Sequence, residues 1–152
     1  STSRCALAIA KTFDRTSKVF FALLEVDEMA QRDPMDRLLD AAVKTATLQL
    51  FAWLDARFTE EISAVKWRYP TPPQVRDIVD TGRLRASQTR IDVDANKATF
   101  VWPVEYAGQV HEGGVSTETR QPFPGRPWTK APLEEAPAKF GEFLSSALEA
   151  EQ

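Results

Sequence analysis

The chain has 152 residues, of which 43% are hydrophobic and 27% charged, a composition typical of one soluble globular domain with a modest core. Its 22 acidic and 19 basic residues give a formal net charge of -3, which disfavours a protein that grips nucleic acid through its phosphates. The single cysteine, Cys5, excludes an internal disulfide, and its apolar neighbours favour a small buried residue over a reactive thiol.

Membrane insertion and secretion are not expected. No apolar run approaches the roughly 20 residues that span a bilayer. The apolar segment 5–10 is too short to read as a secretory signal. We therefore expect a protein that is made in the cytoplasm and has no membrane partner.

Two apolar segments precede the first firm element. Residues 4–13 and 18–29 carry apolar side chains roughly at helical spacing, so residues 1–32 are interpreted as an N-terminal helical segment. The second run, VFFALLEV, is short and apolar enough to form a buried strand equally well, and that alternative stays open.

A long amphipathic helix is predicted within residues 33–59. Asp33 is a favourable N-cap, Pro34 suits the first helical position, and Asp36 places a carboxylate in the first turn. Apolar residues recur at three- and four-residue steps for about seven turns, to an end near Phe58. A helix of this length usually spans one side of a sheet or lines a subunit contact.

Residues 60–79 are predicted to be an excursion loop, because Pro70, Pro72 and Pro73 prevent a continuous helix. A tight turn should follow it and lead directly into a strand. The residues of that turn are Asp80, Thr81 and Gly82.

Residues 80–121 are expected to be the β-rich part of the chain. Residues 86–93 and 97–102 alternate around turn-forming residues and predict a β-hairpin. Residues 104–112 can form a short helix that Gly113 would cap in the left-handed conformation. Residues 115–121 are interpreted as a third strand or a mobile arm.

Residues 122–152 are predicted to contain a proline-rich loop followed by a C-terminal helix. The segment 122–132 has too many prolines for regular structure, whereas 133–150 returns to helical spacing. Pro137 should lie in the first turn of that helix or break it. Together the elements predict a single α+β domain over residues 1–152. Its small, mainly antiparallel sheet would pack against the long amphipathic helix and the C-terminal helix.

Catalytic motifs are weak throughout the sequence. His111-Glu112 begins like a zinc-protease helix, but the next ligand position holds Val115 and no second histidine exists, so a histidine bonded at a helix end is favoured. A nucleophilic triad would have to use His111, and no Gly-x-Ser-x-Gly elbow is present. The glycines are scattered, without a phosphate loop. We expect no enzyme, no metal and no cofactor.

Arg83, Arg85 and Arg90 form a local basic cluster that would suit a phosphate. Three aspartates lie close by in the sequence and would cancel its field, so strand-end arginines paired with acids are the favoured interpretation. These aspartates are Asp80, Asp92 and Asp94.

The order of motifs between residues 34 and 148 resembles the minor tail component family of tailed bacteriophages. Its members serve as tail-completion, tail-terminator or head-tail joining proteins. Three motifs carry the resemblance. They are Asp80, Thr81, Gly82 and Leu84, then Tyr106, Ala107, Val110, His111, Glu112 and Gly113, and finally Pro124, Arg126, Pro127, Trp128, Pro132 and Leu133. The apolar segment before Asp33 and the long 60–79 loop depart from the family pattern.

The resemblance implies a subunit of a ring, commonly a hexamer, between the capsid connector and the tail tube. Its partners would be further copies of the chain, the tail tube protein and the head-tail connector or stopper proteins. Genomic DNA would pass through the ring without specific binding. The protein would then reside in the neck or tail of the virion, and in the host cytoplasm during assembly. The alternative is a monomeric, non-enzymatic binding or inhibitor module that acts on a soluble protein partner.

The segments around residues 106–114 and 124–133 are expected to form the subunit or partner surface. Phe123, Pro127 and Trp128 are interpreted as exposed interface anchors, and Arg126 as a bidentate partner for a neighbour's carboxylate. The predicted interface residues are Tyr106, His111, Gly113, Gly114, Phe123, Arg126, Pro127 and Trp128. On this interpretation Trp128→Ala abolishes ring formation while the subunit stays folded.

Overall fold

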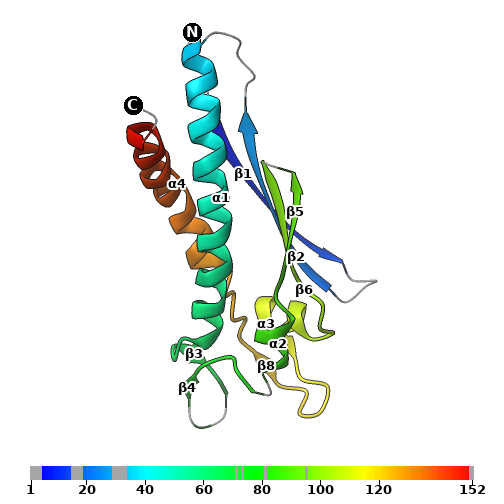
Figure 1. The fold of residues 1–152 in the computed structure, drawn as a ribbon. Helices are drawn as coiled ribbons and strands as arrows, with labels where there is room; N and C mark the ends of the chain where they lie inside the picture. The colour runs from blue at the N-terminus through cyan, green and yellow to red at the C-terminus, as the bar shows by residue number, and fades with distance from the viewer. Residues whose placement is uncertain are drawn as a thin grey trace.

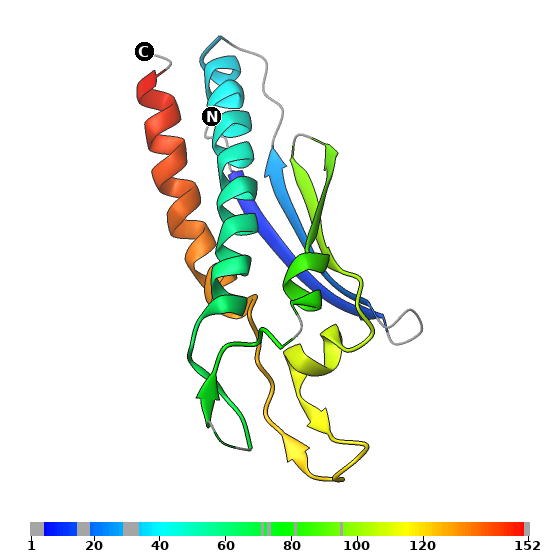
Figure 2. The ribbon, with the colours of Figure 1, turned by 60° about the horizontal axis from the view of Figure 1, so that its bottom comes forward.

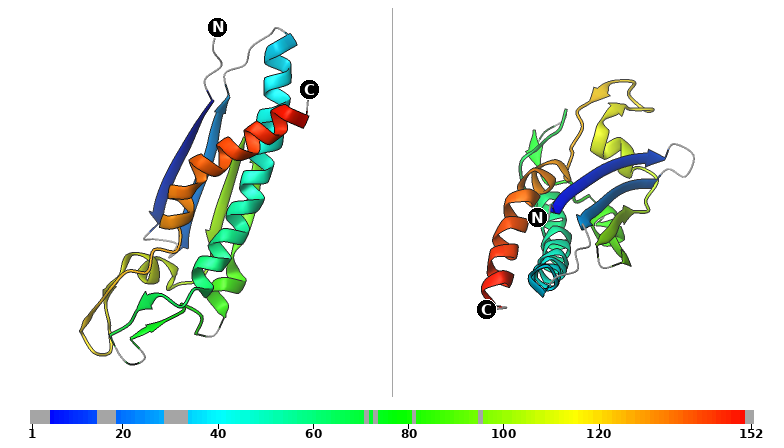
Figure 3. Two further views of the ribbon diagram at one scale, coloured as in Figure 1. Left: turned by 90° about the vertical axis from the view of Figure 1, so that its left-hand side faces the viewer. Right: turned by 90° about the horizontal axis from the view of Figure 1, so that it is seen from above.

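The computed structural model describes residues 5–14, 19–28 and 34–150, apart from residues 71, 73, 81 and 95. It has the predicted α+β fold, in which a small antiparallel sheet packs against two helices, α1 (Pro34–Ser63) and α4 (Lys130–Ala150). The two helices lie side by side on one face of the sheet (Figures 1 and 3). The opposite face carries no helix in the described part of the chain.

The main sheet has four antiparallel strands in the order β1-β2-β6-β5. They are β1 (Cys5–Asp14), β2 (Val19–Glu28), β6 (Lys97–Trp102) and β5 (Thr89–Asp94). The predicted helical segment over residues 1–32 is therefore wrong, and the strand alternative for its second half is correct. Short apolar runs do not distinguish helix from buried strand, and pairing of β2 on both sides decides the outcome.

The predicted hairpin is present as β5 and β6. Ala98, Phe100 and Trp102, which alternate along β6, are all fully buried beneath the helices. The chain does not enter β5 directly from the preceding turn, because a short helix, α2 (Arg83–Ser87), comes first. Gly82 makes this possible at φ 79°, and its carbonyl accepts a hydrogen bond from the backbone N–H of Ala86 at 2.9 Å.

Helix α1 begins at Pro34, as predicted, and continues beyond the expected end near Phe58 to Ser63. Asp33, the predicted N-cap, lies outside the described residues. The last turn stays helical because Glu61 and Ile62 are buried there. The Ile62 carbonyl, which has no partner within the helix, accepts a hydrogen bond from the backbone N–H of Ile78 at 3.1 Å.

Helix α4 begins at Lys130, earlier than predicted, with Pro132 in its first turn. Pro137 was expected to lie in the first turn of the helix or to break it, and this expectation is wrong. It lies in the interior of α4 and is exposed. The missing N–H of Pro137 deprives the Leu133 carbonyl of its helical partner. Packing of this segment through Leu133, Ala136 and Phe140 into the core offsets that loss.

Two small hairpins and helix α3 (Ala107–Glu112) form one end of the molecule (Figure 2). The first hairpin pairs β3 (Trp67–Arg68) with β4 (Val75–Arg76), so the predicted 60–79 loop is partly regular. The second pairs β7 (Gly114–Val115) with β8 (Pro122–Phe123). Of the predicted third strand or arm over 115–121, only Val115 belongs to a strand, and the rest forms the tip of the hairpin. The segment 122–132, predicted to lack regular structure, contains β8 and the start of α4.

The core lies between the sheet and the helices and contains a chain of edge-to-face aromatic contacts. Phe58 of α1 touches Phe100 and Trp102, with ring centroids 5.1 and 5.4 Å apart. Trp102 touches Trp128 at 5.4 Å, and Trp128 touches His111 at 4.9 Å. Such pairs add to the free energy of burial. They connect α1, β6, α3 and the segment before α4 into one unit.

Candidate functional site

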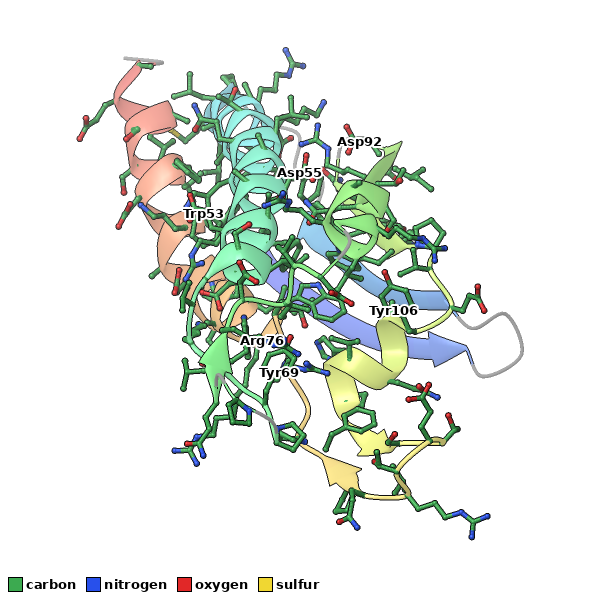
Figure 4. All side chains as sticks on the ribbon, turned by 90° about the horizontal axis from the view of Figure 1, so that it is seen from below. Trp53, Asp55, Tyr69, Arg76, Asp92 and Tyr106 are labelled. Carbon is green, nitrogen blue, oxygen red and sulfur yellow. The ribbon has the colours of Figure 1, made fainter. Side chains whose placement is uncertain are left out.

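A groove of about 290 Å³ lies at the end of the molecule formed by β3-β4, α2 and α3. Four arginines and two tyrosines line it, with Asp80 as the one acidic residue among its walls. We call it the arginine groove and define it by Tyr69, Arg76, Arg83, Arg85, Tyr106 and Arg126. Figure 4 looks onto this end and shows Tyr69 and Arg76 on the side of the β3-β4 hairpin and Tyr106 on the side of α3.

Tyr69 is held in place by the first hairpin. Its backbone N–H donates to the Gln74 carbonyl at 2.9 Å, and its hydroxyl donates to the Asp77 carbonyl at 3.0 Å. The guanidinium carbons of Arg76 and Arg126 lie 3.7 and 4.3 Å from the centre of the Tyr69 ring. Both are cation-π contacts at close range, so the ring orients two positive charges at once.

Arg126 reaches the groove because its backbone crosses close over α3. Its N–H donates to the Val110 carbonyl at 2.8 Å. A Cβ on Gly125 would come within 2.8 Å of the backbone of Glu112, and one on Gly113 within 2.6 Å of the Gly125 nitrogen. Gly113 has φ 83° but ψ 177°, so it ends α3 at a positive φ without the predicted left-handed cap.

The buried Nε atom of Arg126 has no hydrogen-bond partner among the described residues. Buried donors in folded proteins are almost always paired. The guanidinium also lies 5.9 Å from the Phe123 ring centre. Arg126 is therefore stacked and positioned by its neighbours, and its half-buried side chain lines the arginine groove.

The predicted basic cluster divides between two environments. Arg90 pairs with Asp92, with Nε and Oδ1 3.0 Å apart, which agrees with the favoured interpretation of a cation paired with a nearby acid. Arg83 and Arg85 instead line the arginine groove. Arg83 lies 5.8 Å from the Tyr106 ring centre, and Arg85 donates through Nη1 to the Ser63 hydroxyl at 3.0 Å.

A second depression of about 320 Å³ adjoins the arginine groove and shares Tyr106, Val110 and Arg126 with it. Its remaining walls are Gln109 of α3 and the β7-β8 hairpin, where Val115 is 62% exposed and Phe123 half-buried. Together the two depressions combine an arginine-rich half with a half that carries apolar and polar side chains and one acidic residue, Glu118.

The structure brings Tyr106, Phe123 and Arg126 of the predicted interface to this surface, with Asp80 and Gly82 beside them. Gly113 and Gly114 lead into the adjoining hairpin, Pro127 is half-buried, and Thr81 lies outside the described residues.

Trp128 and His111 are not exposed interface residues. Trp128 is completely buried and His111 is 2% exposed, so the expectation that Trp128 anchors a partner is wrong. The Trp128 ring fills the space between Trp102 and His111. The proline-rich sequence around Trp128 is typical of a surface loop. In the structure, however, Trp128 and Thr129 are buried in the core just before α4 begins.

Tyr69 and Arg76 are site residues that the sequence analysis did not select. Both come from the segment predicted as a loop, and the β3-β4 pairing brings them within contact of each other. An aromatic residue and an arginine on either side of a proline-rich tip were the available signal. That signal does not reveal that Arg126, which is distant in sequence, also stacks on the Tyr69 ring.

His111 makes two short contacts that superficially resemble a catalytic triad. Its Nδ1 lies 2.6 Å from Oε1 of Glu112, and its Nε2 lies 2.7 Å from the Thr129 hydroxyl. The order carboxylate, imidazole, hydroxyl is that of a nucleophilic triad. Thr129 is completely buried, however, so no substrate reaches its hydroxyl in this conformation. The contacts join α3 to the start of α4, in keeping with the predicted histidine bonded at a helix end.

In the part of the chain that the structure describes, no group of three or more His, Cys, Asp or Glu side chains is arranged to hold a metal ion. None of the helices described is both long and apolar enough to cross a membrane.

Comparison of the chain with models of protein families, with curated proteins and with solved structures finds no match.

Proposed function

We propose that the chain is a structural subunit of a tailed-phage virion that forms a ring at the neck or the head-proximal end of the tail. The proposal rests on the order of sequence motifs that resembles the minor tail component family. It also rests on one structural observation, that Tyr106, Phe123 and Arg126 of the predicted interface lie together on an exposed arginine- and tyrosine-rich surface.

The composition of this surface suits a protein partner. Tyrosine and arginine are enriched among interface residues that contribute most to binding energy. The arginine groove is built on short, tightly bonded elements, which lowers the ordering cost of an interface. The net charge of -3 is compatible with genomic DNA that passes through a ring without being held.

The partners in this proposal are further copies of the chain, the tail tube protein and the connector or stopper proteins. A ring is made by a heterologous contact, in which one surface of a subunit meets a different surface of the next. The arginine groove supplies one such surface. The hexameric stoichiometry comes from the resemblance alone.

The test is the solution mass of the purified chain by light scattering, over a concentration series and then with tail tube protein added. We expect a discrete ring, or a monomer that forms one only on the tube. A matched variant, Arg126→Glu, should prevent assembly while its circular dichroism spectrum stays that of the native chain. A monomer indifferent to concentration and to the tube contradicts the proposal.

A monomeric binding or inhibitor module is the second candidate. The arginine groove is a concave site formed within one subunit, so it needs no second copy to be complete. Two results together would favour this function. The chain would stay monomeric in the scattering experiment, and the Arg126→Glu variant would no longer bind a soluble partner that the native chain binds.

A further inference from the structure

We propose that the arginine groove binds a carboxylate-bearing segment of a partner protein, with an apolar side chain of the same segment in the adjoining depression. The inference deepens the proposed function, since it takes the groove as the partner surface and names the chemistry of what occupies it.

The charge of the groove is unbalanced within the subunit. Four arginines face one aspartate across its walls. No ion pair found in the described part of the chain includes Arg76, Arg85 or Arg126, whereas Arg57, Lys66, Arg90 and Lys139 are all paired. Two guanidinium groups gathered on one tyrosine ring repel each other, and an anion bound in the groove lowers that cost.

The geometry suits a carboxylate. A guanidinium stacked on an aromatic ring keeps its in-plane N–H groups free, and two of them match the two oxygens of a carboxylate. Arg126, which stacks on the Tyr69 ring and lines both depressions, is placed to offer such a pair of donors. Tyr69 is itself fixed by hydrogen bonds to Gln74 and Asp77, so the donors are positioned before a ligand arrives.

The surroundings favour a peptide over a nucleic acid. The adjoining depression presents Val115, Phe123 and Glu118, which offer apolar contact and a negative charge to whatever extends from the groove. A phosphate backbone carries a negative charge at every step and would meet Glu118 unfavourably. An acidic residue followed by an apolar residue in a peptide satisfies both halves.

The experiment is a selection of a random peptide library on the immobilised full chain. We expect recovered sequences enriched in Asp or Glu with an apolar residue nearby. The most frequent peptide, labelled with fluorescein, is then titrated by anisotropy at low salt, where electrostatic binding is strongest. Arg76→Met and Arg126→Met should each weaken binding about tenfold or more, the expected effect of losing one charge-assisted hydrogen-bond pair.

Arg37→Met is the matched control, because it removes the same charge from the exposed start of α1, at the other end of the molecule (Figure 1). It should leave the affinity unchanged. Arg126→Lys keeps the charge but not the planar fork and should still weaken binding. Near-ultraviolet circular dichroism of every variant shows that the fold is retained.

Several outcomes overturn the inference. One is a selection without acidic enrichment, and another is equal affinity in the Arg76→Met, Arg126→Met double variant. A third is a single-stranded DNA oligonucleotide that binds more tightly than the peptide and is lost with the same arginines, which would assign the groove to phosphate. A chain that binds acidic peptides but forms no ring retains this inference and loses the proposed function.

Discussion

Trp128 shows how a single residue changes role between sequence and structure. It is fully buried against Trp102 and His111, so Trp128→Ala leaves a large cavity in the core. We expect a loss of about 3–5 kcal/mol in the free energy of unfolding, measured by urea denaturation. The earlier expectation of a folded subunit that fails to assemble is therefore replaced by one of a destabilised subunit.

Val115→Ala serves as the control for that change. Val115 is 62% exposed, and its truncation should alter stability by less than about 0.5 kcal/mol. If Trp128→Ala unfolds at the same urea concentration as Val115→Ala, the aromatic chain through Trp128 does not support the core.

Two glycines should respond in opposite ways to the same methyl group. Gly113→Ala places a side chain at φ 83° and 2.6 Å from the Gly125 nitrogen, so it should destabilise the protein by at least about 1–3 kcal/mol. Gly141→Ala adds a methyl group in open space within α4 and should stabilise it by about 0.5–1 kcal/mol. Thermal melts compare the two, and a Gly113→Ala protein no less stable than the native chain would contradict the close approach of Gly113 to Gly125.

At the scale of elements, Arg57 joins α1 to α4 and to the segment that follows α1. Its guanidinium donates two hydrogen bonds to Glu135, at 3.1 and 3.0 Å, and lies 2.7 Å from Oε1 of buried Glu61. Lys66 pairs with the other oxygen of Glu61. The bonds to Glu135, and then the pairing with Glu61, raise the pKa of Arg57 above its ordinary value. This contribution to stability is fully present below the ordinary arginine pKa and is lost only in stronger alkali.

Arg57→Met should lower the free energy of unfolding by about 1–2 kcal/mol, because Glu61 stays buried with one cation fewer. The control is Lys139→Met, which removes an exposed pair within α4 and should cost about 0.3–0.5 kcal/mol. Urea denaturation at neutral pH measures both. An Arg57→Met protein no less stable than Lys139→Met would show that the bridge between the helices contributes nothing.

The elements also show which parts of the fold the sequence could predict. The start of α1 and the β5-β6 hairpin follow local rules, a proline at the first helical position and side chains that alternate around a turn. Strands β1 and β2 could not be assigned with certainty, because their short apolar runs suit a helix or a buried strand equally. The strand state of β2 depends on pairing with β6, which is distant in sequence, and β1 in turn pairs with β2. Helix α2 was missed because five residues carry too little periodicity.

The candidate site could be predicted only in part for the same reason. Tyr106, Phe123 and Arg126 were selected because the composition of their own segments suggested an interface, and the structure places them together. Tyr69 and Arg76 enter the site through tertiary structure, since the Arg126 side chain reaches the ring from a segment distant in sequence. Burial of Trp128 likewise depends on its contacts with β6 and α3. The sequence around Trp128 does not indicate these contacts.

At the scale of the whole molecule, the two ends differ. One end carries the hairpins, α3 and the arginine groove, whereas the opposite end is formed by the start of α1 and the end of α4 (Figures 1 and 2). In the proposed ring, the specialised end would make a directional contact, in which the groove of one molecule meets a different surface of its neighbour. The scattering and peptide experiments examine the assembly and the groove separately.

The edge strand β5 has a consequence for how copies of the chain approach one another. Arg90 and Asp92 lie opposite Phe100 and Ala98, so this ion pair sits on the helix-facing side at the border of the sheet. Charges turned inward on an edge strand hinder another strand from adding to it. The pair therefore hinders a second copy of the chain from extending the sheet at this edge.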